Sequence, residues 1–232
     1  MNSTLLLVLS LGLRHGTDPD HLTAIDGLSR IRPRATNGVY FALGHGLVVT
    51  LLAVGIGRAI AGRVEFLGPW VLILIGVINL WRVLVPARNP VAARRPVIAQ
   101  PFLLGMLLAA SVETASQFGA LILAGRMNPW LVGSVFTVGM VLVDGVDGLL
   151  AASTQKQAAL GQRLAKRASR SLGLLVAVCS FALGGAEILD FDIDQIALPI
   201  GLGLFVAVIA IRVWSRTEKR RVPLLSARAL PA

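Results

Sequence analysis

Long apolar segments recur along this chain, and most of its charged residues lie between them. A helix needs about 20 apolar residues to cross the hydrocarbon layer of a bilayer. Only 15% of the 232 residues are charged and the mean hydropathy is +0.76, whereas roughly a quarter of a soluble domain is charged. The sequence therefore predicts an all-α integral membrane protein with about seven transmembrane helices. The predicted spans are 3–28, 38–62, 66–86, 101–125, 129–152, 171–189 and 195–215.

The basic residues predict how the chain is oriented in the membrane. A net charge of +10 would suggest a nucleic-acid partner for a soluble protein, but here the basic residues fall between apolar segments, and we expect no nucleic-acid partner. They concentrate on one side of the spans, in residues 30–34, the connections 87–100 and 153–170, and a basic tail, 216–232. Because cytoplasmic loops carry the excess of lysine and arginine, we predict one transmembrane domain, 1–215, in the cell membrane, with the N-terminus outside and the tail in the cytoplasm.

Spans one to three and spans four to six form two related halves in our interpretation. In each half, the first two spans carry the charges that lie within the membrane. An odd number of helices per half inverts the second half relative to the first, as in many secondary transporters. Although sequence identity between the halves is low, we hypothesise two inverted three-helix repeats followed by one further helix.

The first predicted span holds the most polar segment inside the membrane. Residues 14–21 (RHGTDPDH) are followed by Asp26, so two histidines and three carboxylates lie within twelve positions. Each ionisable group at membrane depth costs on the order of 2.5–3.5 kcal/mol. We therefore expect these groups to compensate one another or to bind an ion.

Pro19 predicts that the helix breaks within this segment. Proline disfavours a helical conformation for Asp18 and has no amide hydrogen to donate. In a continuous helix, His15 and His21 would point about 120° apart. An unwound turn at 16–18, with Thr17 or Asp18 as the N-cap of a second helix, would let both imidazoles converge. Such a turn is tolerated at membrane depth only where it is buried in protein or lines a cavity.

The histidines favour a transition-metal site. The third and last histidine, His45, lies in the second predicted span. Imidazoles together with carboxylates suit Ni²⁺, Co²⁺ or Zn²⁺, whereas Mg²⁺ and Ca²⁺ prefer oxygen ligands. We predict His15, Asp20, His21 and His45 as metal ligands. For His45 taken alone, a helix–helix hydrogen bond or a proton carrier stays open as an interpretation.

Two more polar pairs lie in the second half of the chain. Glu113 and Gln117 are four residues apart in the fourth span, and Asp144 and Asp147 are three apart in the fifth. Residues at these spacings share a helix face. Hydrogen bonding between helices is the simpler interpretation. Because two carboxylates in one membrane helix are costly for that purpose alone, we expect an ion pathway or a proton relay.

Four segments, in this order, resemble motifs of the nickel/cobalt transporter family. Residues 15–21 match its H-x4-D-H signature, and residues 41–45 (FALGH) resemble its FxLGH motif. Residues 113–117 (ETASQ) resemble its DTATE motif, and residues 139–148 (GMVLVDGVDG) resemble its GMxLxDTxDG motif. Their joint occurrence is much more specific than any single one. The chain departs from the family pattern at Pro19, Glu113, Gln117, Gly145 and Val146.

The resemblance implies a permease that moves Ni²⁺ and/or Co²⁺ across the membrane, with His15, Asp20 and His21 central to selecting the ion. The ion is then the transported substrate, and we expect no cofactor and no enzymatic activity. The sequence contains neither an H-E-x-x-H pair nor a G-x-x-x-x-G-K-[ST] phosphate loop. The residues that we expect to orient ligands, balance charge or line the pathway are Asp18, Asp26, Glu113, Gln117, Asp144 and Asp147.

Two alternatives to an uptake permease stay open at this point. One is an exporter on the same scaffold, and the other is a membrane subunit or metal sensor that does not transport. The lack of a histidine-rich cytoplasmic loop favours uptake. The expected partners are a divalent transition-metal ion and the lipid bilayer, and the sequence leaves open a homo-oligomer or a peripheral ATPase. Metal binding by neutral imidazoles should weaken as the pH falls toward about 6.

Overall fold

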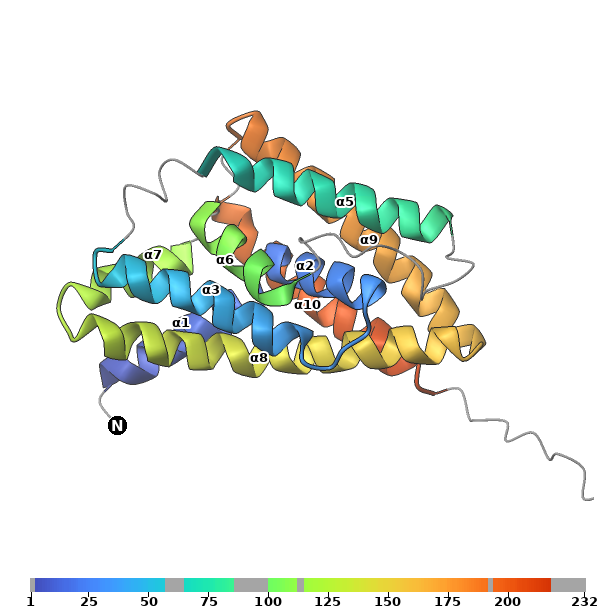
Figure 1. Cartoon of the computed structure of the whole chain (residues 1–232), viewed down its shortest axis with the longest axis horizontal. Coiled ribbons are helices and arrows are strands. Elements are labelled where there is room, and N and C mark those ends of the chain that lie inside the picture. Colours follow the sequence, from blue (N-terminus) through green and yellow to red (C-terminus); the bar gives the residue numbers. More distant parts are fainter. Residues whose placement is uncertain (1–2, 57–64, 86–99, 112–114, 192–193, 218–232) are drawn as a thin grey trace, which may run out of the picture.

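The chain forms a bundle of helices that lie mostly along its long axis (Figure 1). The computed structural model describes residues 3–56, 65–85, 100–111, 115–191 and 194–217, and within these ranges it contains helices and no strands. The elements are α1 (Ser3–His15), α2 (Pro19–Ile31), α3 (Asn37–Ala53), a 3₁₀ turn η1 (Glu65–Leu67), α5 (Gly68–Leu84), α6 (Pro101–Ser111), α7 (Ala115–Ala124), α8 (Pro129–Ala159), α9 (Arg163–Ile188) and α10 (Asp194–Trp214).

The two longest helices of the described part could each cross a membrane. They are α8, with 31 residues, and α9, with 26. The outward face of α8 presents side chains that are just over half exposed, namely Val138, Leu142, Val146 and Leu149. Its inward face presents fully buried side chains, namely Met140, Asp144, Asp147 and Ala151. Apolar groups thus point outward and carboxylates inward, the arrangement that a lipid environment requires.

The predicted break in the first span is confirmed. α1 ends at His15 and α2 begins at Pro19, with Asp18 as the N-cap residue in an extended conformation. The Asp18 side chain makes no capping hydrogen bond, because its carboxylate contacts His15 instead. The predicted fourth span, 101–125, is also described as two helices, α6 and α7, with residues 112–114 outside the described part.

Helix α2 is enclosed by protein on all sides. Every residue from Pro19 to Ser29 is buried. This is so although α2 is the least apolar of the helices in the bundle. It packs against α3, α5, α6, α8, α9 and α10. Ile25 and Leu28 belong to one apolar cluster with α5 and α6, and Leu22 belongs to another with α9 and α10. The polar side chains of α2 are therefore held in the interior of the bundle.

Two helix crossings bring backbone against backbone through glycine. A Cβ atom added to Gly12 of α1 would lie 2.1 Å from the carbonyl oxygen of Phe136 in α8. A Cβ atom added to Gly105 of α6 would likewise lie 2.1 Å from the carbonyl oxygen of Phe41 in α3. The residues that complete the two crossings are Gly139 against Leu9, and Gly44 against Phe102. The α1–α8 and α6–α3 crossings therefore share one pattern of small residues, which allows close approach.

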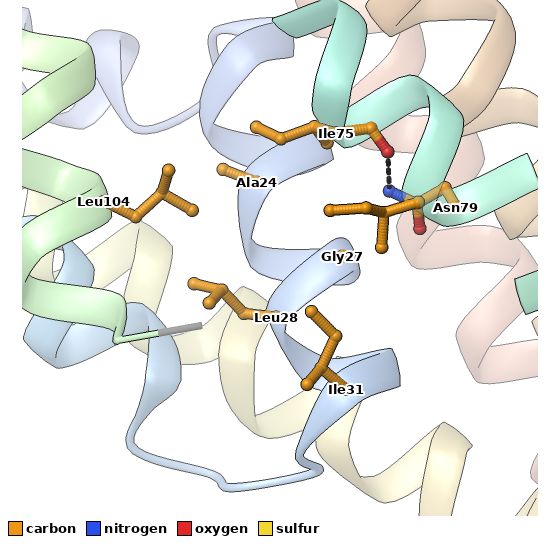
Figure 2. Close-up of a pocket in the computed structure, with 8 residues that line it drawn as sticks. Ala24, Gly27, Leu28, Ile31, Ile75, Asn79 and Leu104 are labelled. Atoms are coloured by element: carbon orange, nitrogen blue, oxygen red, sulfur yellow. Dashed lines mark hydrogen bonds between the residues drawn. The ribbon is translucent and has the colours of Figure 1, made fainter. Parts of the chain in front are cut away.

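An apolar pocket lies between α2, α5 and α6 (Figure 2). It is lined by Ala24, Gly27, Leu28, Ile31, Ile75, Ile78, Asn79 and Leu104. The only polar side chain in this set is Asn79, whose Nδ2 donates to the carbonyl oxygen of Ile75 over 2.9 Å. None of the residues that the sequence predicts as ligands or pathway residues lines this pocket.

Candidate metal centre

The three histidines of the chain meet in the middle of the bundle. His15 ends α1, His21 lies in the first turn of α2, and His45 lies in α3. One ring nitrogen of each lies within 4.8 Å of the others, and the ring centroids are 4.6 to 4.7 Å apart. All three side chains are fully buried. We call this group the histidine cluster.

The broken helix explains how two of these rings converge. The last turn of α1 closes with hydrogen bonds from the amides of Gly16, Thr17 and Asp18 to carbonyls of the preceding residues. A Cβ atom on Gly16 would lie 2.9 Å from Cβ of Val143, so the turn packs directly on α8. α2 then restarts at Pro19, which lacks the amide hydrogen that this position leaves unpaired in any helix.

Two carboxylates hold two of the imidazoles. The Nδ1 atom of His15 lies 2.9 Å from Oδ2 of Asp18, and Nδ1 of His21 lies 3.0 Å from Oδ2 of Asp144. An ionised carboxylate only accepts hydrogen bonds, so a neutral imidazole in either position carries its hydrogen on Nδ1 and keeps a lone pair on Nε2. A histidine that binds a metal is typically backed by a carboxylate in this way.

His45 supplies the third nitrogen. Its Nε2 lies 2.8 Å from Nε2 of His15. Because Nε2 of His15 is the acceptor, His45 donates this hydrogen bond when no ion lies between the rings. Nε2 of His21 and Nδ1 of His45 have no hydrogen-bond partner among the described residues. Gln117 of α7 is fully buried and is the polar neighbour of His45.

The other residues singled out from the sequence do not all lie at the histidine cluster. Asp18 and Asp144 contact the histidine cluster, as described above. Asp20 is buried beside His21, but within the described part the potential ligand group consists of the three histidines and does not include it. Glu113 lies outside the described residues.

Asp26 and Asp147 belong to a separate buried ionic network. Arg212 of α10 donates to both carboxylates, to Oδ1 of Asp147 and, over 3.2 Å, to Oδ1 of Asp26. Arg30 donates from Nε to Oδ2 of Asp26 over 2.7 Å. Arg212, Asp147 and Asp26 are all at most 1% exposed. Our sequence analysis missed Arg212, although its position as the only charged residue within 195–215 was a usable signal.

These features define a class of protein before any comparison. The bundle presents apolar side chains outward, and it encloses three imidazoles of which two are backed by carboxylates. This combination is consistent with an integral membrane protein that holds a candidate transition-metal centre in its interior.

Comparison with known proteins relates the chain to nickel transporters. The sequence model of the family described as high-affinity nickel-transport protein matches residues 2–65, which contain all three histidines. The chain is similar to the hydrogenase nickel incorporation protein HupN of Bradyrhizobium diazoefficiens, with 29% identity over 86% of this chain and 67% of HupN. It is also similar to the high-affinity nickel transport protein of Cupriavidus necator, with 48% identity over 22% of this chain and 16% of that protein.

A third relative is the nickel transporter NixA of Staphylococcus aureus, with 36% identity over 32% of this chain and 28% of NixA. Two of these three alignments therefore cover less than a third of the relative. No solved structure matches the chain. The family model covers residues 2–65 only, and together with these relatives it supports membership of the nickel/cobalt transporter family.

Proposed function

We propose that the protein is a permease for Ni²⁺ and/or Co²⁺ that binds the ion at the histidine cluster. The observation that carries this proposal is the convergence of three buried imidazole nitrogens within 4.8 Å of one another. The relatives named above as nickel transporters support the same substrate. The ion is the transported substrate, and the protein needs neither a cofactor nor an enzymatic step.

The ligands in this proposal are the Nε2 atoms of His15, His21 and His45. Asp18 and Asp144 orient the first two rings and increase the basicity of their ligating nitrogens. For His45 to bind through Nε2, its hydrogen must move to Nδ1. Asp20 then balances charge beside His21 rather than binding the ion. This assignment revises the sequence prediction of Asp20 as a ligand.

The proposed direction is uptake toward the basic end of the molecule. The α2–α3 connection, the α8–α9 turn and the last turns of α5 and α10 all lie in the right-hand half of Figure 1. The basic connections that we expect in the cytoplasm adjoin these ends, which supports an N-terminus outside. An inside-negative potential of 100 mV then contributes about 4.6 kcal/mol to the entry of a divalent ion.

We further propose that the bundle consists of two inverted repeats, α1–α5 and α6–α9, with α10 added, and that together they make seven spans. Residues 38–48 and 133–143 share the pattern G-x-x-F-x-x-G-x-x-L-V. α3 and α8 pack antiparallel, since Gly38 lies against Asp144 and Gly133 lies against Thr50. The matching glycine crossings of α1 with α8 and of α6 with α3 support the same relation.

Accumulation of radiolabelled Ni²⁺ and Co²⁺ at sub-micromolar concentration tests this function. Cells would express the wild type, a His21→Ala variant, a Gly203→Ala control, or empty vector. The control lies in α10, where an added Cβ meets nothing within 4 Å. If the protein takes up metal, the wild type and the Gly203→Ala control should accumulate more metal than the vector. The His21→Ala variant should not. Accumulation below vector would mean export, and no difference with protein present in the membrane would indicate a sensor or a subunit.

A further inference from the structure

The ionic network of Asp26, Asp147 and Arg212 lies directly beyond the histidine cluster along the same two helices. α2 carries both His21 and Asp26, and α8 carries both Asp144 and Asp147. At 1.5 Å rise per residue, the second residue of each pair lies about 4.5–7.5 Å further along its helix. Both helices run toward the basic end in Figure 1. An ion that leaves the histidines in this direction meets the network next.

The network leaves polar atoms unsatisfied. Oδ2 of Asp147 and Nε of Arg212 are buried and have no hydrogen-bond partner among the described residues. An ion pair kept only for stability gains little, because replacing a buried pair by apolar residues is often neutral or stabilising. A buried network in which carboxylate lone pairs lack hydrogen bonds is energetically unfavourable if its only role is to hold helices together. Those lone pairs are suitable ligands for a divalent cation.

Charge balance explains why such a cation and Arg212 would exclude each other. Asp26 and Asp147 carry two negative charges, and Arg30 and Arg212 carry two positive ones, so the network is neutral. A divalent ion added to it would leave two uncompensated positive charges in the protein interior, which is strongly unfavourable. Withdrawal of Arg212 lowers that excess and frees Oδ1 of both aspartates.

Helix α10, which carries Arg212, also contacts the broken turn near the histidines. A Cβ atom on Gly201 would lie 3.2 Å from the carbonyl oxygen of Thr17 and 3.2 Å from Cδ of Pro19. Pro199 lies inside the same helix, where it removes one backbone hydrogen bond. α10 therefore touches both the turn that positions His15 and His21 and the two aspartates beyond it.

We propose that Asp26 and Asp147 form a second divalent-cation site, which receives the metal from the histidine cluster and which Arg212 occupies as a tethered cation when no metal is there. This proposal rests on the transport function proposed above. Arg212 would thus close the pathway at rest, and its withdrawal with α10 would open it.

Binding stoichiometry of Co²⁺, measured by equilibrium dialysis of the purified protein, tests the second site. We expect one equivalent per chain for the wild type and for Arg212→Lys, and two for Arg212→Gln. The double variant Arg212→Gln/Asp147→Asn should return to one. The double variant His21→Ala/Arg212→Gln should keep one, and this result would hold even if transport through the histidine cluster were disproved. A single equivalent in folded Arg212→Gln, with wild-type transport, would overturn the proposal.

A second measurement uses protein in which Arg212 is not substituted, so it does not depend on whether Arg212→Gln folds. Ser29 lies one turn beyond Asp26 and is fully buried. In a Cys179→Ser background, Ser29→Cys should react slowly with a water-soluble thiol reagent. Saturating Co²⁺ should raise that rate while the open state stays a minor one, because each ion that passes into the second site requires Arg212 to withdraw. A rate that Co²⁺ does not change would contradict withdrawal of Arg212.

Discussion

The hydrogen bond between His21 and Asp144 provides the sharpest test of the metal centre. Asp144→Asn keeps the size of the side chain and an oxygen that can accept from Nδ1 of His21, but it removes the charge. Asp144 is fully buried, so neither water nor salt screens that charge. Charge-assisted hydrogen bonds are roughly twice as strong as neutral ones, and loss of such a partner typically lowers metal affinity by about 10–100-fold.

The expected effect can be followed by thermal unfolding as well as by calorimetric titration. At a Ni²⁺ concentration of 100 times the wild-type dissociation constant, bound metal stabilises the fold by about 2.7 kcal/mol. An affinity lower by 10–100-fold reduces this stabilisation to roughly 0.4–1.4 kcal/mol. Without metal, Asp144→Asn should be no less stable than the wild type, because a neutral amide costs less to bury than a carboxylate.

Asp190→Asn is the matched control for this experiment. It makes the same chemical change at an exposed residue that contacts none of the three histidines. Asp190 has a φ of 53°, a conformation that asparagine also tolerates. The Ni²⁺ affinity and the stability of the Asp190→Asn variant should therefore equal those of the wild type. If Asp144→Asn bound Ni²⁺ within twofold of the wild type, the argument that Asp144 orients His21 for a metal would be wrong.

Three further predictions follow from the same geometry. His45→Gln should lower Ni²⁺ affinity by more than Asp144→Asn does, because it removes a ligand, and titration of both variants would compare them. Gly139→Ala should destabilise the fold by about 1–3 kcal/mol, because its Cβ would lie 2.6 Å from the carbonyl oxygen of Leu9, whereas Gly203→Ala should stay within about 0.5 kcal/mol of the wild type. Unfolding curves of the two glycine variants test this contrast. Ni²⁺ affinity should fall steadily from pH 8 toward about 6, since protons compete for the same imidazole nitrogens, and a flat profile would refute histidine ligation.

Local rules predicted the part of the centre that lies within a short stretch of chain. Pro19 indicated the break after His15, because the effect of proline on its neighbours does not depend on the rest of the fold. The partner of His21 could not be read in the same way. His21 and Asp144 are 123 residues apart, and the spacing of Asp144 and Asp147 says only that they share a face, not which helix they meet.

The positions of Asp20 and Arg212 relative to their neighbours could not be predicted, for a related reason. Asp20 precedes His21 in the sequence, and this proximity suggested a shared role as ligands. Consecutive residues of a helix point about 100° apart, so the two side chains need not reach one site. Arg212 lies in the last helix, far from the segments that drew attention, and only the packing of α10 on α2 and α8 shows that it pairs with their aspartates.

The short, enclosed helix α2 has a consequence for synthesis of the protein. α1 and α2 have 13 residues each, and α2 has its polar side chains buried by helices that are made later. At roughly 5–20 residues per second, the ribosome needs about 6–25 s to add the 123 residues between His21 and its partner Asp144. During that time the translocon or a membrane chaperone must shelter the nascent N-terminal segment. Defects in α8 should therefore appear first as early degradation of the chain, before any effect on metal can be measured.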